Sequence, residues 1–214
     1  MDRSRLGIVI PALNEAATIA DVVKAARIYG TPIVVDDGST DATAHLAKQS
    51  GAVVVSHLQN SGYDGALNSG FIKADEIGCE IVITVDADGQ HDPMLIQRFI
   101  DAIDAKADIV VGIRSRKQRL AEHIFAVYTR LRFGIKDPLC GMKAYRIPVF
   151  KALGHFDSYG SIGTELSLFA AKNGYQIQQI PFCVRERQGR SRFGAVLSAN
   201  TRVFRALVLA IYRR

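Results

Sequence analysis

The chain has 214 residues, of which 48% are apolar and 22% are charged, a composition that suits a folded domain with its own core and excludes a disordered chain. No apolar stretch approaches the roughly 20 residues of a membrane span, and no secretory signal opens the sequence, so we expect a cytoplasmic protein. The net charge of +6 is uneven, because residues 1–109 hold 8 basic and 16 acidic residues, whereas residues 110–214 hold 19 basic and 5 acidic residues. The acidic half suits a metal ion and the basic half suits phosphates, nucleic acid or an anionic membrane, although two solvated faces would explain the same charges.

The first half of the chain alternates short apolar strands with helices. Strands are predicted at residues 6–11, 33–35, 52–56, 80–85 and 107–113, and helices after Asn14, after Thr40–Asp41, over residues 64–76 and from Asp92–Pro93 onward. This alternation predicts right-handed β-α-β units, and hence an α/β fold with a mostly parallel central sheet flanked by helices.

Polar clusters follow four of the predicted strands: Asn14–Glu15, Asp36–Asp37, Asp86–Asp88 and Arg114–Arg116. In open parallel sheets, ligands bind at the carboxyl ends of the strands. We therefore expect the four clusters to converge on one binding cleft.

The second half of the chain is less regular. Its pattern predicts a basic helix over residues 118–133, a turn and strand over 137–146, a helix over 162–172, a strand over 176–184, an arginine-rich loop over 185–194 and a terminal amphipathic helix over 193–212. No internal repeat or flexible linker interrupts the chain, so we expect one continuous domain.

Two carboxylates, Asp86 and Asp88, lie on either side of one alanine beyond an apolar strand. Such a pair can turn toward one hard cation, and Mg²⁺ and Mn²⁺ prefer oxygen ligands. A solvated Asx turn before the helix at Asp92 explains the same residues, and the motif by itself leaves both interpretations open.

The other polar clusters allow a similar choice. A carboxylate at Asp36–Asp37 can accept hydrogen bonds from a ribose or a base, although a helix N-terminus also favours acids; two adjacent acids at a ligand-binding edge favour binding. Arg114 and the loop 185–194 can hold phosphates through guanidinium groups, or they are basic loops in water.

Several common site motifs are absent from the sequence, which contains no G-x-x-x-x-G-K-[ST], no G-x-S-x-G, no H-E-x-x-H and no G-x-G-x-x-G after the first strand. These absences leave a metal-assisted site for a nucleoside diphosphate without a P-loop. No aromatic and basic platform accompanies the pI of about 9.3, so no nucleic-acid partner is expected.

Six segments carry a family resemblance, in this order: IVIPALNEAATI, VVDDGSTDAT, VDADGQHDP, VVGIRSR, DPLCGMKAYR and RQGRSRFG. They resemble the family 2 glycosyltransferases of GT-A fold, and within these the dolichyl- and polyprenyl-phosphate sugar transferases. The resemblance implies a single GT-A domain over residues 1–214, in which residues 1–116 bind nucleotide and metal and residues 117–214 bind the acceptor. It further implies an inverting transfer from a nucleotide-diphosphate sugar to a lipid-linked acceptor in cell-surface glycan synthesis.

The resemblance also implies a role for individual residues. Pro11, Asn14 and Glu15 would line the nucleotide pocket, Asp37 would contact the base or ribose, Asp86 and Asp88 with Gln90 would bind Mg²⁺ or Mn²⁺, Arg114 would hold phosphate, and Arg187, Ser191 and Arg192 would belong to a loop that clamps donor or acceptor. The metal and Arg114 would then stabilise the leaving diphosphate.

The acceptor decides whether a general base is needed. A lipid phosphate, whose second pKa is about 6, arrives as an anion and needs none, whereas a sugar hydroxyl requires a base. Asp137 and Glu165 are the candidate bases, although an acid at Glu165 also suits the start of a helix. Arg130 and Arg132 both remain candidates for the acceptor phosphate.

The terminal helix allows two arrangements. Its apolar side chains can bury in an anionic surface at the inner face of a membrane or pack on a partner subunit, or they can pack on the protein's own core. These side chains are Phe193, Val196, Leu197, Val203, Phe204 and Leu207.

Two alternative functions stay open from the sequence, a sugar-nucleotide nucleotidyltransferase and a non-catalytic sugar-nucleotide-binding subunit. A homo-oligomer is a further prediction.

Overall fold

The structure is a computed structural model that describes residues 2–89, 94–115, 119–183 and 196–212. The strands are β1 (Leu6–Ala12), β2 (Thr31–Asp36), β3 (Val53–Ser56), β4 (Ile81–Thr84), β5 (Ile109–Arg114), β6 (Lys143–Arg146) and β7 (Ile177–Phe182). The helices are a 3₁₀ turn (Arg3–Arg5), α1 (Ile19–Arg27), α2 (Thr43–Gln49), α3 (Gly62–Glu76), α4 (Met94–Asp104), α5 (Leu120–Phe133), α6 (Ile147–Leu153), α7 (Glu165–Lys172) and α8 (Val196–Tyr212).

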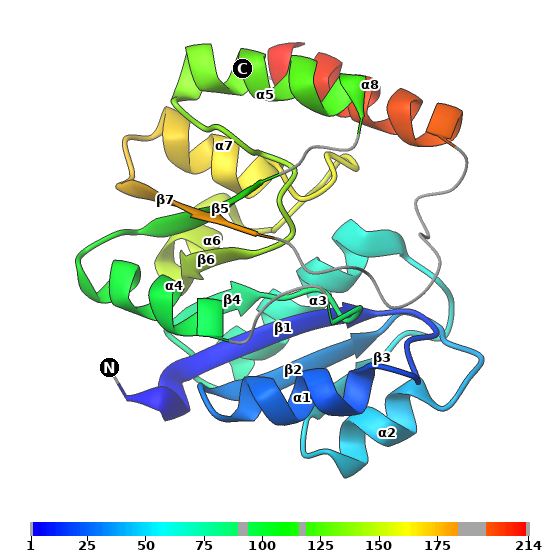
Figure 1. Cartoon of the computed structure of the whole chain (residues 1–214). Coiled ribbons are helices and arrows are strands. Elements are labelled where there is room, and N and C mark those ends of the chain that lie inside the picture. Colours follow the sequence, from blue (N-terminus) through cyan, green and yellow to red (C-terminus); the bar gives the residue numbers. More distant parts are fainter. Residues whose placement is uncertain (1, 90–93, 116–118, 184–195, 213–214) are drawn as a thin grey trace.

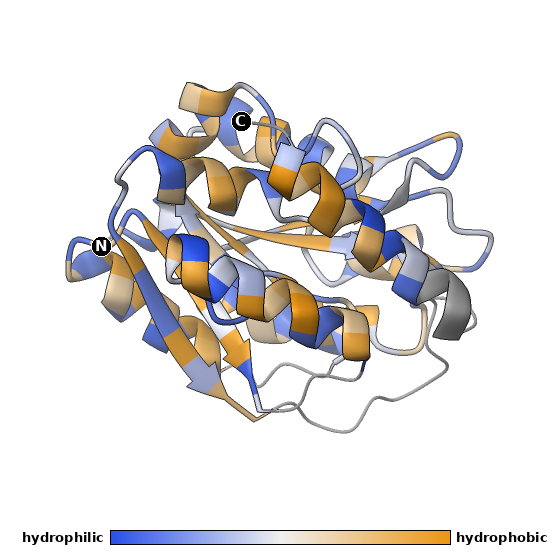
Figure 2. Cartoon of the chain, turned by 90° about the horizontal axis from the view of Figure 1, so that it is seen from above, coloured by the Kyte–Doolittle hydropathy of each residue, from blue (hydrophilic) through white to orange (hydrophobic). Residues whose placement is uncertain are grey.

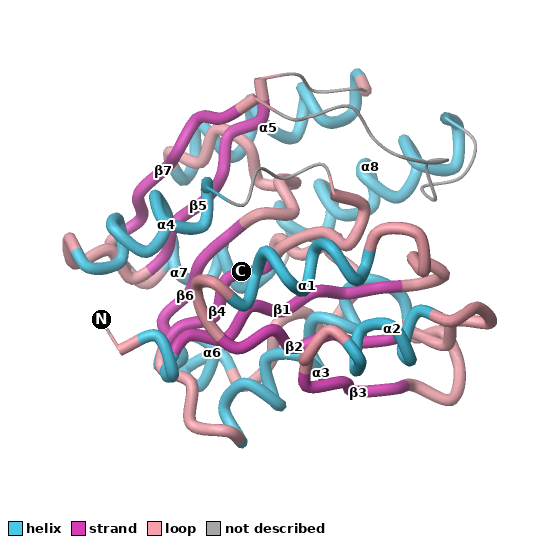
Figure 3. The backbone as a smooth tube through the Cα atoms, turned by 60° about the horizontal axis from the view of Figure 1, so that its bottom comes forward, coloured by secondary structure: helices cyan, strands magenta, loops and turns pink. Residues whose placement is uncertain are grey.

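The strands form one seven-stranded sheet in the order β3-β2-β1-β4-β6-β5-β7, which Figure 3 shows as a continuous twisted layer. β1 pairs in parallel with β2 and β4, and β5 pairs in parallel with β7. β6 is the exception, because it lies antiparallel between β4 and β5, with Val82 opposite Tyr145 and Val110 opposite Ala144. The predicted α/β fold with a mostly parallel sheet is confirmed.

Helices cover both faces of the sheet (Figure 1). Alternate residues of β1 point to opposite faces, so Ile8 packs in a core with α1, α2 and α4, and Val9 packs in a second core with α3 and α5–α8. α3 lies especially close to β1, because a Cβ built at Gly70 would come within 2.3 Å of Val9 Cγ1. Full burial of large side chains such as Phe71 and Phe99 contributes roughly 1.5–3 kcal/mol each.

The structure differs from the sequence prediction in the second half of the chain. α6 was not predicted, and Pro148 occupies its first turn, where proline is tolerated. α7 begins at Glu165 and not at Ile162, because Ile162 and Gly163 have φ values of 58° and 67°, in the left-handed region that a helix cannot use. The described part of the terminal helix, α8, lies within the predicted range 193–212.

α8 resolves part of the choice that the sequence left open. Val203 and Leu207, two of the side chains predicted for a membrane or a partner, are buried in the protein's own core, whereas Phe204 is 43% exposed. Phe193 lies outside the described residues. Within the described ranges, no helix has both the length and the apolar character needed to span a bilayer.

Candidate active site

The loops that follow β1 and β2 are bonded to each other at the carboxyl edge of the sheet. Asn14 Oδ1 accepts a hydrogen bond from the Thr40 amide at 2.7 Å, and the Asn14 amide donates to Ser39 Oγ at 2.8 Å. The Glu15 amide donates to Thr43 Oγ1 at 2.7 Å. Asn14 has a φ of 49°, which asparagine tolerates better than most residues. The Asn14–Glu15 cluster is therefore bonded to the segment that directly follows Asp36–Asp37, as expected for neighbouring parallel strands.

Pro11 lies near the end of β1, opposite Val35 of β2, and it is half-buried. Because proline lacks an amide hydrogen, it cannot donate to the hydrogen bonds of a sheet, and this suits a position near the point where β1 passes into the Asn14 loop. The predicted nucleotide-lining residues Pro11, Asn14 and Glu15 are thereby brought to the same edge of the sheet as the end of β2.

The acidic pair follows β4 at this edge. Asp88 is buried and Asp86 is half-buried, and the carbonyl of Ala87 between them accepts a hydrogen bond from Thr18 Oγ1 at 2.7 Å. A Cβ built at Gly141 would lie 2.5 Å from Asp86 Oδ2. The glycine of the DPLCGM segment is therefore required by the close approach of the Asp86 carboxylate to the backbone.

The donor chemistry of this pair suits a hard cation, because both side chains offer carboxylate oxygens. Among the described residues, however, no three histidine, cysteine or acidic side chains are grouped as a metal site. Gln90, the predicted third ligand, lies outside the described residues, and so do Arg187, Ser191 and Arg192 of the predicted loop 185–194.

The two aspartates at the end of β2 have different surroundings. Asp37 Oδ1 accepts hydrogen bonds from the amide and hydroxyl of Ser61, each at 2.8 Å, and lies 2.7 Å from His57 Nδ1; Oδ2 accepts from the Gly62 amide at 2.9 Å. His57 Nε2 in turn lies 2.8 Å from Ser69 Oγ. These contacts occupy Oδ1 with the chain's own groups, whereas Oδ2 accepts a single bond and can accept another from a ligand.

Asp36, in contrast to Asp37, has a carboxylate oxygen that accepts no hydrogen bond from the described residues. Its Oδ1 atom is buried and has no hydrogen-bond partner in the described part of the chain. A buried carboxylate oxygen without a partner is costly unless a ligand supplies a donor. The sequence singled out Asp37 of this pair, and the structure draws attention to its neighbour.

Arg114 and Asp137, predicted separately as a phosphate ligand and a general base, bind each other. Arg114 Nε and Nη2 donate to the two carboxylate oxygens of Asp137, each at 2.9 Å, and the Arg114 amide donates to Oδ2 at 3.0 Å. Glu122 Oε2 accepts a further bond from Nη2 at 3.3 Å, and Arg119 pairs with Glu122 Oε1 at 2.9 Å.

This arrangement changes both predicted roles. Asp137 is 1% exposed and both of its oxygens accept hydrogen bonds from Arg114, which disfavours the predicted role of general base, and that role stays a prediction. Burial lowers the pKa of Arg114, but the hydrogen bond and charge of Asp137 outweigh it, and the net pKa is raised. The planar fork of Arg114 is directed at a carboxylate, so it is not available for a bidentate grip on phosphate.

Glu165 is the other predicted base, and it too is engaged. It begins α7, and its oxygens accept hydrogen bonds from the Ser158 amide at 2.6 Å and the Ser158 hydroxyl at 3.0 Å, with His155 Nε2 3.0 Å away. These contacts fold the segment before α7 back onto the helix start. These contacts give Glu165 a structural role in addition to its place at the start of α7, and its role as a general base stays a prediction.

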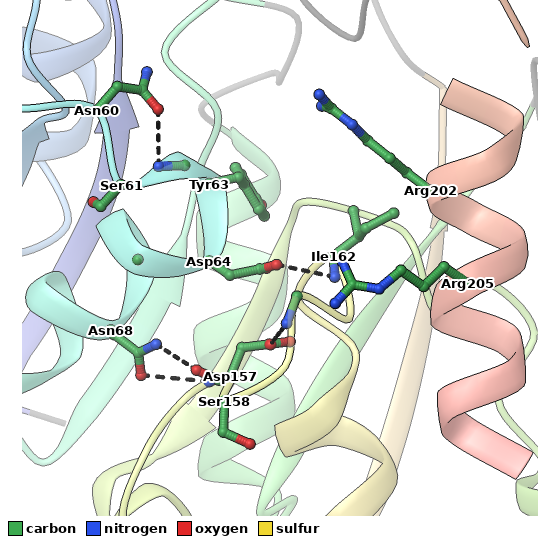
Figure 4. A pocket seen from close by; sticks show the side chains of 13 residues that line it. Asn60, Ser61, Tyr63, Asp64, Asn68, Asp157, Ser158, Ile162, Arg202 and Arg205 are labelled. Atoms are coloured by element: carbon green, nitrogen blue, oxygen red, sulfur yellow. Dashed lines mark hydrogen bonds between the residues drawn. The ribbon is translucent and has the colours of Figure 1, made fainter. Parts of the chain in front are cut away.

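A pocket of about 520 Å³ opens between the N-terminus of α3, the loop 157–163 and α8 (Figure 4). We call it the α3–α8 pocket, and it is lined by Asn60, Ser61, Gly62, Tyr63, Asp64, Gly65, Asn68, Asp157, Ser158, Gly160, Ile162, Arg202 and Arg205. Burial, followed by the charge of Asp86, raises the pKa of Tyr63 well above its ordinary value, so the charge of Asp86 reaches this wall of the pocket.

The two carboxylates of the pocket are directed at backbone amides. Asp64 accepts from Ile162 at 3.1 Å and from Gly163 at 2.6 Å, and Asp157 accepts from three consecutive amides, those of residues 159–161. Burial, followed by the charge of Asp157, raises the pKa of Asp64 to about 6. These acids shape the loop that forms the pocket floor.

Two arginines supply the positive charge of the pocket. Arg202 and Arg205 are exposed and extend from α8 (Figure 4). Arg205 Nη2 also donates a hydrogen bond to the Tyr159 carbonyl at 3.4 Å. Arg130 and Arg132, the arginines that the sequence favoured for an acceptor phosphate, lie in the last turn of α5 and do not line this pocket. No role was predicted for Arg202 or Arg205, and their spacing of three residues, which places them on one side of the terminal helix, is the signal in the sequence that could have indicated this site.

The fold and the site together define a nucleotide-binding α/β enzyme of GT-A architecture. Residues 7–159 match glycosyl transferase family 2. Because this match covers most of the sequence, the chain belongs to glycosyl transferase family 2 and is a glycosyltransferase. The resemblance stated from the six sequence segments is confirmed.

Relatives with named activities support the same placement. The chain is 29% identical to the polyprenol monophosphomannose synthase of Mycolicibacterium smegmatis, over 85% of this chain and 77% of that protein. It is 29% identical to the UDP-N-acetylglucosamine–dolichyl-phosphate N-acetylglucosaminyltransferase of Methanococcus voltae, over 81% of this chain and 83% of that protein. The glucosyl-3-phosphoglycerate synthase of Mycobacterium tuberculosis, solved with Mn²⁺ and UDP-glucose, superposes with a TM-score of 0.78 at 27% identity, over 98% of this chain and 79% of that one.

Proposed function

We propose that the protein transfers a sugar, with inversion, from a nucleoside-diphosphate sugar to the phosphate group of a polyprenyl-type lipid. One observation carries the proposal: an acidic pair follows β4 at the carboxyl edge of the sheet, and the charge of its Asp86 reaches Tyr63 in the wall of a pocket that two arginines line. The carboxylates suit a cation on the donor diphosphate, and the arginines suit an acceptor phosphate. The named relatives that act on polyprenol and dolichyl phosphates support this choice of acceptor.

The donor would bind at the carboxyl edge of the sheet. Pro11, Asn14 and Glu15 would line the nucleotide, and the aspartates at the end of β2 would face its base or ribose. Asp86 and Asp88 would hold Mg²⁺ or Mn²⁺, with Gln90 as the predicted further ligand. When bound, the cation would neutralise charge on the departing diphosphate.

The acceptor would bring its own nucleophile. A phosphate monoester carries between one and two negative charges near neutral pH and needs no base to attack the anomeric carbon. This agrees with the engagement of Asp137 by Arg114 and of Glu165 by Ser158. Arg202 and Arg205 would orient the phosphate, and the carboxylates of the pocket are already directed at backbone amides.

A lipid-linked acceptor places the enzyme at a membrane surface. We propose a peripheral position on the cytoplasmic face, where anionic lipids attract the basic second half of the chain. The predicted homo-oligomer stays a prediction.

Turnover with defined substrates tests the proposal. The full chain is incubated with Mn²⁺, a panel of labelled UDP-, GDP- and dTDP-sugars, and a short, water-soluble prenyl phosphate, and the glycosylated lipid phosphate is quantified. We expect product with one donor class, and loss of at least 100-fold in rate for Asp88→Asn but not for Asp101→Asn, an exposed acid on α4.

Two results would overturn the proposal. Formation of a sugar nucleotide from a sugar phosphate and a nucleoside triphosphate would indicate the nucleotidyltransferase alternative. Tight donor binding without turnover on any prenyl phosphate or sugar acceptor would indicate a non-catalytic binding subunit.

A further inference from the structure

α5 and α8 present a shared apolar surface to solvent. Eight of the thirteen large apolar side chains that are exposed in the described part of the chain belong to these two helices, and they are between 41% and 83% exposed. They are Leu120, Ile124, Val127 and Leu131 of α5, and Phe204, Val208, Ile211 and Tyr212 of α8. We call this surface the α5–α8 face.

The spacing of these residues gives each helix one buried apolar side and one exposed apolar side. On α5 they recur at intervals of four, three and four residues, which is one stripe of a helix, while the opposite stripe, including Phe125 and Thr129, is buried. On α8, the opposite stripe includes Val203 and Ala206, which pack in the core. Since the inner side of each helix already packs in the core, no packing among the described residues covers the exposed apolar side chains of the outer sides.

The two helices lie side by side as a single layer. They pack against each other, and Tyr128 of α5 donates a hydrogen bond to the Ala210 carbonyl of α8 at 3.4 Å. The pair crosses the top of the molecule in Figure 1, and the view from above in Figure 2 shows apolar segments on both helices. The exposed residues therefore form one continuous apolar surface, unlike the single, scattered apolar side chains of an ordinary protein exterior.

The exposed charged side chains that α5 and α8 themselves contribute, among their described residues, all have one sign. Arg130 and Arg132 of α5 and Arg202 and Arg205 of α8 are exposed. Glu122 is the one acidic residue in the sequence of either helix, and it is 4% exposed and bound to Arg114 and Arg119. An apolar surface on two helices whose exposed charged side chains, among the described residues of those helices, are all arginines fits an interface with anionic lipids.

The same charges disfavour a second copy of the chain as the occupant. A two-fold contact through this face would bring the arginines of one copy to the arginines of the other, and neither helix offers an exposed carboxylate to pair with them. We propose that the α5–α8 face docks the enzyme on an anionic bilayer, a proposal that rests on the lipid-linked acceptor inferred above.

The geometry links this face to the α3–α8 pocket. Arg202 and Arg205 line the pocket, and Phe204 and Val208 of the same helix lie on the docking face. An acceptor whose chain remains in the bilayer could thus present its phosphate at the pocket without leaving the membrane. α8 forms the boundary between the two environments.

Vesicle flotation of the full-length protein tests the proposal. Vesicles contain either phosphatidylcholine alone or phosphatidylcholine with 30% phosphatidylglycerol, a composition chosen to be anionic but fluid. We expect binding to the anionic vesicles, and at least tenfold weaker binding for the double variant Val127→Glu/Val208→Glu. The control Ile72→Glu changes a residue of α3 that is 51% exposed, similar to Val127 at 57% and Val208 at 48%, and should bind as the original protein does.

A second measurement separates docking from folding and from catalysis. The double variant should keep its melting temperature within a few degrees and its rate on a short, water-soluble prenyl phosphate, while its rate on a long-chain prenyl phosphate in anionic vesicles falls at least tenfold. Unchanged vesicle binding of the double variant would overturn the docking proposal, and so would a stable dimer that the double variant abolishes. If vesicle binding follows the prediction but no prenyl phosphate is glycosylated, the docking face stands and the proposed acceptor fails.

Discussion

Arg114 and Asp137 form a two-pronged ion pair in which both donors lie 2.9 Å from the carboxylate oxygens. The pair joins the end of β5 to the segment that leads into β6, and it is nearly enclosed, with Asp137 1% exposed. A pair buried this deeply supports the local structure only while both partners are present, because a single remaining charge would be uncompensated.

Removal of one partner should therefore destabilise the fold. We expect Asp137→Ala and Arg114→Ala each to lower the free energy of unfolding by roughly 3–5 kcal/mol, and the double variant to cost clearly less than the sum of the two. Urea unfolding of the four proteins measures the coupling. If Asp137→Asn unfolds like the original protein but loses turnover completely, Asp137 acts in catalysis and the structural role is contradicted.

The two aspartates after β2 should respond differently to the same change. Asp37→Asn places an amide nitrogen among the donors from Ser61 and Gly62, so we expect a loss of about 1–3 kcal/mol in the free energy of unfolding. Asp36→Asn removes the charge of a buried oxygen that has no described partner, so stability should be unchanged or higher while the KM for the donor rises. Denaturation and donor saturation curves for both variants check this, and a reversal of the two patterns would contradict it.

Asp64 should make stability fall as pH rises through the acid range. Its pKa in the folded protein is about 6, against an ordinary value of 3.8, so the folded state holds this proton more tightly than the unfolded chain does. The contribution is complete below pH 4 and is lost progressively as the pH approaches and passes 6. Relative to the original protein, Asp64→Asn should gain on the order of 2 kcal/mol between pH 4 and pH 7. Urea titrations at each pH test this, and parallel pH profiles for the two proteins would contradict it.

Gly141 should be intolerant of a side chain for a reason specific to the acidic pair. A Cβ at this position would lie 2.5 Å from Asp86 Oδ2, so Gly141→Ala must displace the carboxylate. We expect the Mn²⁺ concentration needed for half-maximal turnover to rise at least tenfold. Gly78→Ala is the control, because its φ of 81° strains an alanine at a turn with no neighbouring atom within 4 Å; it should lose some stability and keep the Mn²⁺ response.

The arginines of the α3–α8 pocket should act on the acceptor and not on the donor. Arg202→Gln and Arg205→Gln each remove a charged hydrogen-bond donor, worth roughly 1.5–3 kcal/mol in a favourable contact, so the KM for a short prenyl phosphate should rise by about tenfold or more. Arg130→Gln, in the last turn of α5, is the control. A rise in the donor KM instead would assign these arginines to the donor diphosphate.

Local sequence patterns predicted much of the fold. The apolar runs that became β1, β2, β4 and β5 and the polar residues after them were identified from periodicity, because buried parallel strands are continuous apolar segments and their carboxyl ends share one edge. β6 lies within the turn and strand predicted over residues 137–146, but its position in the sheet was not predicted. Nothing in its four residues indicates that they insert antiparallel between β4 and β5.

The sequence identified residues of the candidate site, but it did not predict which of their side chains contact each other. The sequence by itself determined that acidic groups follow β2 and β4 and that arginines gather in the second half, since these are properties of single segments. Only the tertiary structure decided that Arg114 binds Asp137, that Ser61 and Gly62 occupy Asp37, and that α8 rather than α5 supplies the arginines of the pocket. Which charged side chains form a pair depends on how helices and loops that are distant in sequence pack on the sheet. Burial then favours arrangements in which every charge has a partner, because an unpaired charge away from water is costly.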